Sequence, residues 1–358
     1  MRPSALTFAV LCLVALVPAP LAAQLVHGRV TATEGAPVEG ALVVLLRGSG
    51  GVAATTLTTI AGDFAFRGLD PGDYRLRVER IGHESVEADS VAVGSRDTAY
   101  VVIVAPPRAI ALEAIEAVGE ARCELQSEAG AHTARLWEEA RKALTATVLV
   151  AREGRLVMRA VRWERELNPA TEAVLSERAR ELVTVSGSLF RAMPVDQLMT
   201  RGFAVVENGQ QVMYGPDAEV LLSDAFLDSH CFRVTEGRDR SLIGLAFEPL
   251  EGRTQPEIRG VLWLGRADAE LKFIEYTFVN LDVPGPPGLY TGRTELGRLP
   301  DGSWAVTRWH IRSPRVVIRR GGAQVHDVVS VESLHEEGGQ VVQVTAGGRP
   351  LWVPPNRK

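Results

Sequence analysis

The front of the chain is defined by residues 35–82, which read GAPVEGALVVLLRGSGGVAATTLTTIAGDFAFRGLDPGDYRLRVERIG. Ala41–Leu46 is a short apolar run between glycines, as expected for a buried strand. Phe64 and Phe66 are two positions apart, so both rings point to one face of a second strand. A third strand with one solvated face begins at Tyr74. Short strands with a turn about every ten residues predict a β-sandwich.

Two turn motifs separate these strands. At the first, Gly62 is free to adopt a positive φ and Asp63 can bond to its own backbone. At the second, Pro71 presets φ and Gly72 is expected to supply the positive φ. The predicted structural turn residues of the sandwich are Gly40, Gly62, Asp63, Pro71 and Gly72.

This stretch resembles the carboxypeptidase-regulatory-like domain, also called the transthyretin-like or carbohydrate-binding-like fold. The resemblance covers about residues 25 to 105. The matching motifs are Gly28-Arg29-Val30, Pro37-Val38-Glu39-Gly40-Ala41, Thr59-Ile60-Ala61-Gly62-Asp63-Phe64, Pro71-Gly72-Asp73-Tyr74 and Ile81-Gly82-His83. The resemblance implies a Greek-key β-sandwich and an extracytoplasmic location. It implies no reaction, because such domains accompany many different proteins.

The first 23 residues are typical of a secretory signal peptide. Arg2 precedes an apolar core, and Leu21-Ala22-Ala23 predicts cleavage between Ala23 and Gln24. The apolar run is too short for a transmembrane helix, and Leu11 before Cys12 disfavours a lipoprotein site. We therefore expect an exported protein that lies in the periplasm or at the outer membrane or cell surface.

Length and composition indicate a folded chain with two domains. The 358 residues are 46% hydrophobic and 23% charged, with a formal net charge of −5 and no basic cluster, so nucleic acid is an unsuitable partner. The expected division is a signal peptide at 1–23, the sandwich at 24–105, a linker at 106–122, a β-rich domain at 123–346 and a flexible tail at 347–358. The expected oligomeric state is a monomer.

Two cysteines remain after the predicted cleavage. In an oxidising compartment Cys123 and Cys231 are expected to form one disulfide. Two buried thiols or a metal pair are the alternatives. A metal pair would need further ligands, and His230, directly beside Cys231, would point the other way on a strand.

The second domain combines two predicted helices, near 134–145 and 217–229, with an antiparallel meander. Asp217 is the candidate N-cap of the second helix. His335-Glu336-Glu337 is expected in a glycine-flanked turn between strands 325–331 and 340–344. The economical arrangement is a mainly β fold with a curved antiparallel sheet, or half-barrel, and one or two helices. In the strand-turn-strand units from residues 260–264 into 271–274, and over residues 304–311, it resembles the open half-barrel of periplasmic lipoprotein carriers of the LolA kind.

No motif in the chain predicts catalysis, a metal or a cofactor. None of the seven histidines begins a His-x-x-Glu, so the zinc site of a carboxypeptidase is missing. A Gly-x-Ser-x-Gly elbow, a Gly-x-Gly-x-x-Gly motif and a phosphate loop are also missing. Asp224 and Asp228 would share one helix face, which indicates a solvated surface rather than a glycosidase pair.

Three hypotheses about function follow. The favoured one is a non-catalytic exported binding or interaction module of the cell envelope, with an envelope protein, a glycan or a lipid as its partner. The alternative is a periplasmic carrier that holds a hydrophobic ligand on the half-barrel, and an unrecognised hydrolase ranks last. A ligand groove could be lined by aromatic residues of neighbouring strands, namely Trp263, Tyr276, Trp304 and Trp309.

Overall fold

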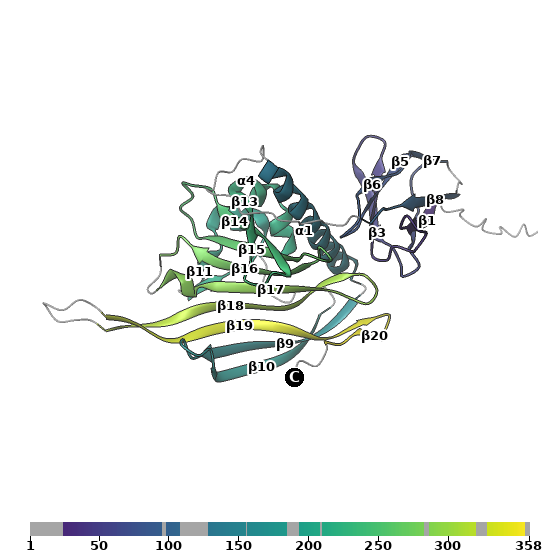
Figure 1. Cartoon of the computed structure of the whole chain (residues 1–358). Coiled ribbons are helices and arrows are strands. Elements are labelled where there is room, and N and C mark those ends of the chain that lie inside the picture. The colour runs from purple at the N-terminus through teal and green to yellow at the C-terminus, as the bar shows by residue number, and fades with distance from the viewer. Residues whose placement is uncertain are drawn as a thin grey trace, which may run out of the picture.

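The fold is mainly β, with a sandwich at the N-terminus and one broad curved sheet carrying helices, which confirms the predicted fold class (Figure 1). The computed structural model describes residues 24–94, 98–107, 128–154, 156–184, 193–207, 210–282, 286–319 and 328–354. The predicted signal peptide, all of the linker beyond Pro107, and Cys123 lie outside the described residues.

The sandwich packs a three-stranded sheet against a five-stranded one. The first has the order β4-β1-β8 and the second β3-β2-β5-β6, with β7 also paired to β5. Strand β8 runs parallel to β1, and the other pairs are antiparallel. The strands are β1 Leu25–Thr31, β2 Leu42–Arg47, β3 Val52–Leu57, β4 Asp63–Arg67, β5 Gly72–Glu79, β6 Val86–Glu87, β7 Val91–Val93 and β8 Thr98–Val104.

Strand β2 is buried on both faces, which explains its unbroken apolar sequence. Val43 and Leu45 lie in the core of the sandwich. Leu42 and Val44 form a separate buried cluster on the other face, against Leu149 of α1 in the second domain. A strand covered on both sides needs apolar residues at consecutive positions rather than at alternate ones. The same run therefore builds the sandwich and docks it onto the rest of the chain.

The second domain is built on an antiparallel sheet in the order β10-β9-β19-β18-β17-β16-β15-β14-β13, with β20 paired to β19. A separate hairpin, β11–β12, and a 3-10 helix at Pro287–Leu289 lie outside this sheet. The strands are β9 Leu156–Leu167, β10 Val174–Thr184, β11 Ala204–Glu207, β12 Gln210–Met213, β13 His230–Glu236, β14 Leu242–Pro249, β15 Glu257–Gly265, β16 Leu271–Val279, β17 Thr291–Arg298, β18 Trp304–Arg319, β19 Val328–Ala346 and β20 Arg349–Trp352.

The described part of the second domain contains four α-helices, of which α1, α3 and α4 pack over one face of the sheet. They are α1 Glu128–Glu153, α2 Val195–Arg201, α3 Ala218–Leu222 and α4 Asp224–Ser229. The core beneath them joins Leu136 and Leu144 of α1 to Phe226 of α4 and to Phe247 and Phe278 of the sheet, all almost fully buried. Burial of this amphipathic stripe holds α1 on the sheet.

The helix expected at 217–229 is divided in two. Asp217 caps α3 as predicted, since its side chain accepts a hydrogen bond from the backbone N–H of Val220 at 2.8 Å. Ser223 then leaves the helical conformation, with ψ of 141°, and its hydroxyl accepts from the N–H of Phe226 to cap α4. A second N-cap in the middle of the segment is therefore the reason for the break. Asp224 and Asp228 are exposed.

The turn expected around residues 335–337 does not exist, because β19 runs unbroken through them. Gly338 and Gly339 lie in this strand opposite large rings. A Cβ atom at Gly338 would lie 2.6 Å from the ring of Trp163, and one at Gly339 would lie 2.7 Å from that of Trp309. These glycines make room for indole rings on the two faces of the sheet. Within the expected tail, Arg349–Trp352 form β20.

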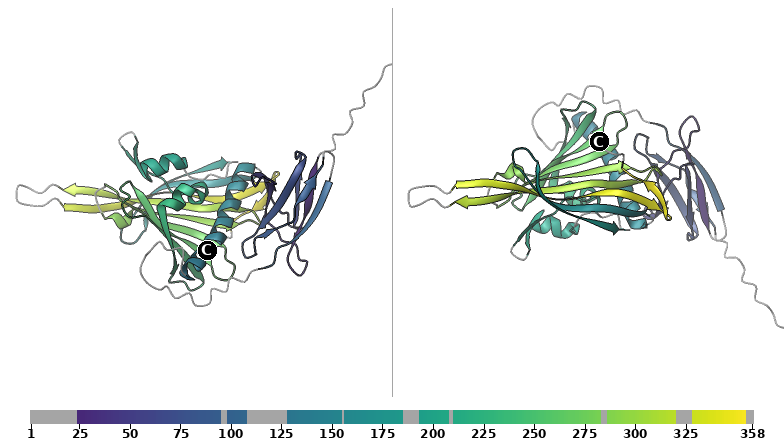
Figure 2. Two further views of the ribbon diagram at one scale, coloured as in Figure 1. Left: turned by 90° about the horizontal axis from the view of Figure 1, so that it is seen from above. Right: turned by 90° about the horizontal axis from the view of Figure 1, so that it is seen from below.

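The sandwich lies against one end of the large sheet and of α1, while the far half of the β18–β19 hairpin extends from the other end (Figures 1 and 2). Ile81, in the loop after β5, is buried in the core of the second domain. Lys142 of α1 donates hydrogen bonds to the carbonyl groups of Arg80 and His83, at 3.2 and 2.9 Å. The Ile-Gly-His motif of the sandwich is thus part of the contact between the domains.

Candidate binding groove on the large sheet

Some of the residues predicted to form turns of the sandwich have the expected backbone conformation, and others lie at the start of strands. Gly40 and Gly62 have positive φ, at 64° and 77°, as expected. A Cβ atom at Gly62 would lie 2.4 Å from the carbonyl oxygen of Val30, so the turn needs a glycine there. The expectation for Gly72 is wrong, since it begins β5, and the positive φ before Pro71 belongs to Gly68. Asp63 begins β4 and pairs with Arg29 at 2.7 Å.

The four aromatic residues considered for a groove do not share one face of the sheet. Tyr276 and Trp304 belong to the core beneath the helices. Trp309 belongs to a second buried cluster, with Leu156 of β9 and other residues. Trp263 points to the opposite face, where it lies 6.3 Å from Phe273 between ring centroids. The structure therefore uses most of these rings as core.

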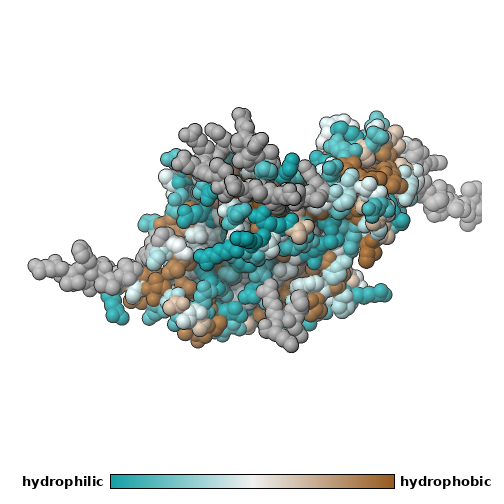
Figure 3. All heavy atoms as spheres, viewed as in Figure 1, coloured by the Kyte–Doolittle hydropathy of each residue, from teal (hydrophilic) through white to brown (hydrophobic). Residues whose placement is uncertain are grey.

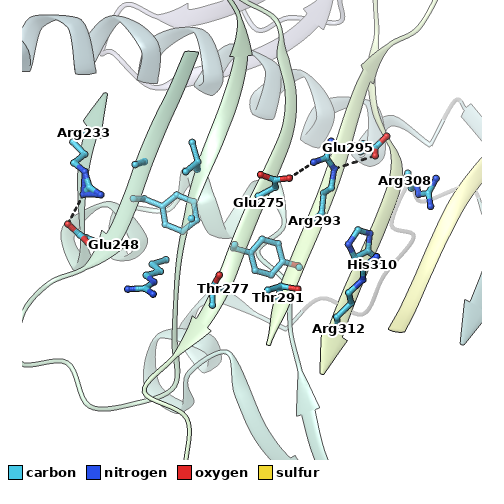
Figure 4. Close-up of a pocket in the computed structure, with 17 residues that line it drawn as sticks. Arg233, Glu248, Glu275, Thr277, Thr291, Arg293, Glu295, Arg308, His310 and Arg312 are labelled. Atoms are coloured by element: carbon cyan, nitrogen blue, oxygen red, sulfur yellow. Dashed lines mark hydrogen bonds and ion pairs between the residues drawn. The ribbon is translucent and has the colours of Figure 1, made fainter. Parts of the chain in front are cut away.

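The face of the sheet away from the helices is hollowed into an open polar groove (Figure 4). Its volume is about 810 Å³, and its lining residues come from six consecutive strands, β13 to β18. The side chains alternate along each strand, so that charged residues point into the groove while their apolar neighbours point to the core. The charged lining consists of Arg233, Glu248, Arg259, Glu275, Arg293, Glu295, Arg308 and Arg312.

Part of this charge is neutralised within the groove. Arg233 pairs with Glu248 at 3.0 Å. Arg293 of β17 forms an ion pair with Glu275 and lies 3.4 Å from a carboxylate oxygen of Glu295. The guanidinium of Arg293 also covers the ring of Phe273, with 3.6 Å between its central carbon and the ring centroid. These contacts fix the side chains at the centre of the groove.

A buried carboxylate supports the β18 side of the groove. Glu336, only 3% exposed, accepts hydrogen bonds from Arg312 at 2.7 Å and from the indole of Trp163 at 2.9 Å. Burial alone would raise the pKa of Glu336, but these hydrogen bonds and the nearby cations outweigh it and lower the pKa. Burial also lowers the pKa of His310.

Two arginines of the groove have no such counter-charge. No described carboxylate lies within ion-pairing distance of Arg259, which is exposed, or of Arg308, which is half-buried 5.4 Å from the ring centroid of Trp163. The lining residues include five arginines and three carboxylates, and one of those arginines, Arg312, pairs outside the lining with Glu336 and Glu172. Arg259 and Arg308 are therefore the two arginines of the lining without an ion pair to a described carboxylate, and Glu295 is the directly opposed cross-strand neighbour of Arg308.

A buried serine, histidine and glutamate lie close together beneath α4. The Ser229 hydroxyl is 3.1 Å from Nδ1 of His230, and Nε2 of His230 is 3.8 Å from Glu257. All three are almost completely buried. Nδ1 also contacts the carbonyl of Phe226 at 3.0 Å, and the His230 ring stacks on the ring of Phe226. This arrangement is that of a core histidine held by its neighbours, out of reach of a substrate.

The sequence analysis did not single out the groove arginines. The available signal was the spacing of Arg308, His310 and Arg312, which places three polar side chains on one face of β18. Within the described residues no cluster of three or more histidine, cysteine or acidic side chains is suitable for a metal ion. Likewise, none of the helices described there is both long enough and apolar enough to span a membrane.

Comparison with known proteins identifies the N-terminal domain. Residues 25–105 match the family model of the carboxypeptidase regulatory-like domain, which confirms the resemblance seen in the sequence. No curated protein matches the chain.

Among solved structures, the chain is similar to a streptococcal ancillary pilin at 9% identity and a TM-score of 0.23. The match covers 87% of this chain and 59% of the pilin. It is also similar to "a putative carbohydrate binding protein from Bacteroides uniformis ATCC 8492", at 11% identity and a TM-score of 0.21, covering 67% of this chain and 98% of that one. Similarity at this level carries no argument about function.

Proposed function

We propose that this protein is a non-catalytic, exported binding module of the cell envelope, and that its ligand occupies the groove on the large sheet. The observation that carries the proposal is the groove itself. A volume of about 810 Å³ lies in the range of small-molecule sites, and the lining groups are held in place by ion pairs on a sheet of hydrogen-bonded strands. The predicted signal peptide supports export.

Binding is favoured over catalysis because of the groups that face the groove. Thr277 and Thr291 supply aliphatic hydroxyls, and neither has a described hydrogen bond to a histidine or a carboxylate that could activate it. Tyr276 also contributes to the lining, but its side chain belongs to the core and its hydroxyl bonds to Thr294. A regulatory-like domain at the N-terminus agrees with an accessory role.

The alternative function, a carrier of a hydrophobic ligand, is supported by a cavity that lies away from the helix-facing side of the sheet. The helix-facing side of the sheet is filled by packed side chains such as Phe247 and Phe278. A cavity of about 430 Å³ lies instead between the sandwich and the second domain. Apolar side chains predominate in its lining, which includes Leu57, Ile60, Val150, Leu156, Ala346 and Leu351. An apolar ligand would therefore be expected at this junction.

The first experiment is native mass spectrometry, with lipid extraction, on protein purified from the periplasm, followed by an array of envelope glycans. A polar ligand that is lost on substitution of groove residues would support the proposal. A co-purifying lipid that survives those substitutions and is displaced by Leu57→Asp would favour the carrier. Hydrolytic turnover of a peptide or glycan that disappears with one point mutation would refute a non-catalytic role.

A further inference from the structure

The groove presents a row of donors across four strands. The register pairs Arg259 of β15 with Thr277 of β16, Thr277 with Thr291 of β17, and Thr291 with Arg312 of β18. Paired residues in adjacent strands point to the same face, so two guanidinium groups flank two hydroxyls. With strands about 4.8 Å apart, the row extends over roughly 14 Å.

Of the two arginines in this row, only Arg259 lacks a described carboxylate partner. Arg312 is neutralised by Glu336 and also pairs with Glu172. Arg259 has no described carboxylate partner, and the second such cation, Arg308, lies three strands away on β18 and four residues before Arg312. A ligand that neutralised both would cross the groove diagonally and would carry at least two separated negative charges.

The remaining lining indicates that the ligand also carries hydroxyl groups. Carboxylates of Glu275 on β16 and Glu295 on β17 lie between the two cations and can accept hydrogen bonds, while the two threonine hydroxyls can donate or accept. The nearby ring faces are already occupied, since Arg293 covers Phe273 and Arg165 lies 4.4 Å from the ring centroid of Trp163. Recognition therefore depends on charge and hydrogen bonds rather than on stacking.

An extended peptide fits this surface poorly. Peptides that bind to sheets add a strand at a free edge, where backbone N–H and C=O groups are unpaired. Strands β14 to β17 each have a hydrogen-bonded neighbour on both sides, and the groove lies over their middle. The ligand must therefore be recognised by side chains alone. A ligand that carries a series of hydroxyl groups and carboxylates can be recognised in this way.

We propose that the groove binds an acidic glycan and that Arg259 and Arg308 bind carboxylates of separate uronate units in it. The inference rests on the proposed function and specifies its ligand. Hydroxyls of the glycan form hydrogen bonds with the hydroxyls of Thr277 and Thr291. The sheet supplies the spacing between the two cations, and the ion pairs around Arg293 hold the floor of the groove.

The test is isothermal calorimetry of the full mature chain with tetragalacturonate and with its fully methyl-esterified form, which keeps the hydroxyls and removes the charge. The acid should bind at least tenfold more tightly than the ester, and more weakly as salt rises. Arg259→Gln and Arg308→Gln should each weaken binding of the acid about tenfold. Arg67→Gln, an exposed arginine of the sandwich, is the matched control and should bind like the unsubstituted protein.

Three results would overturn the inference. Equal affinity for acid and ester would show that the groove reads hydroxyls only, which leaves the proposed binding function intact. Equal or tighter binding of tetraglutamate would replace the glycan by an acidic peptide. Unchanged affinity in both groove variants, with circular dichroism showing them folded, would remove the ligand from this groove and the proposed function with it.

Discussion

At the scale of single residues, the side chain of Glu336 links the core of the sheet to the groove. It is almost fully buried. It forms ion pairs with Arg312 and, at 3.6 Å, with Arg165, and it accepts a hydrogen bond from the indole of Trp163. Removal of one member of a buried ionic network leaves the others without compensation, which costs more than the network contributes as a whole.

We expect Glu336→Gln to lower the free energy of unfolding by about 2–4 kcal/mol, because Arg312 loses its buried counter-charge. Urea denaturation monitored by tryptophan fluorescence would measure the loss. Glu332→Gln is the matched control, since Glu332 is exposed on the same strand and should change stability by no more than about 0.5 kcal/mol. Equal stability of both variants would contradict the role given to Glu336.

A second residue-scale prediction concerns pH. Burial lowers the pKa of His230 to about 4, against an ordinary value of 6.5, and hydrogen bonds to Phe226 and Ile258 only partly oppose this. The unfolded chain therefore takes up a proton before the folded one does, so stability falls as pH decreases from about 6.5 to 4.

NMR of the histidine ring protons would test this directly, with His230→Gln used to assign the signal. The His230 signal should keep its neutral position down to about pH 5. A midpoint near 6.5 would show that the ring is in contact with solvent and would reopen the case for the Ser229–His230–Glu257 cluster as a site.

At the scale of elements, α1 is the connection between the two domains. Its Glu139 accepts a hydrogen bond from the N–H of Gly82 at 2.9 Å and pairs with Lys142 at 2.9 Å, and both side chains are about 5% exposed. Arg141 reaches the buried Glu79 of β5 at 2.9 Å. One turn of helix thus holds the loop of residues 80–83.

Lys142→Met should loosen this contact, because it leaves Glu139 buried without its cation and removes two hydrogen bonds to the loop. We expect a loss of about 3 kcal/mol in unfolding free energy and faster hydrogen exchange at residues 80–83. Arg135→Gln, on the exposed side of α1, should leave both unchanged. Unaltered exchange in the Lys142 variant would mean that apolar packing alone docks the sandwich.

At the scale of the whole molecule, the predicted disulfide would close a loop of about a hundred residues. Cys231 lies in β13, and Cys123 lies outside the described residues, so the pairing remains a prediction. Thiol labelling of the unfolded, non-reduced protein should modify no cysteine, and two labelled cysteines would contradict the bond. Reduction should destabilise the protein by roughly 4–5 kcal/mol in the chain-entropy model.

The sequence by itself determined the classes of structure in this protein. The alternation at Phe64 and Phe66, the turn at Gly62 and the recurrence of short strands with a turn about every ten residues predicted the sandwich. A two-residue period and a positive φ are local properties, so the sequence shows them directly. The apolar stripe of α1 within residues 134–145 could also be predicted, because the helical period is likewise a local property. The prediction from local pattern was wrong where glycines were interpreted as a turn. Gly338 and Gly339 lie within a strand, where the absence of a side chain leaves room for indole rings.

The groove was decided by the tertiary structure alone. Arg259 and Arg308 are almost fifty residues apart in the chain, and each belongs to a strand pattern of ordinary alternation. They face one groove only because antiparallel register across β15 to β18 brings them to the same side of the sheet. A shift of one residue in any of these pairings would move a whole row of side chains to the opposite face, so the site depends on the packing that fixes register.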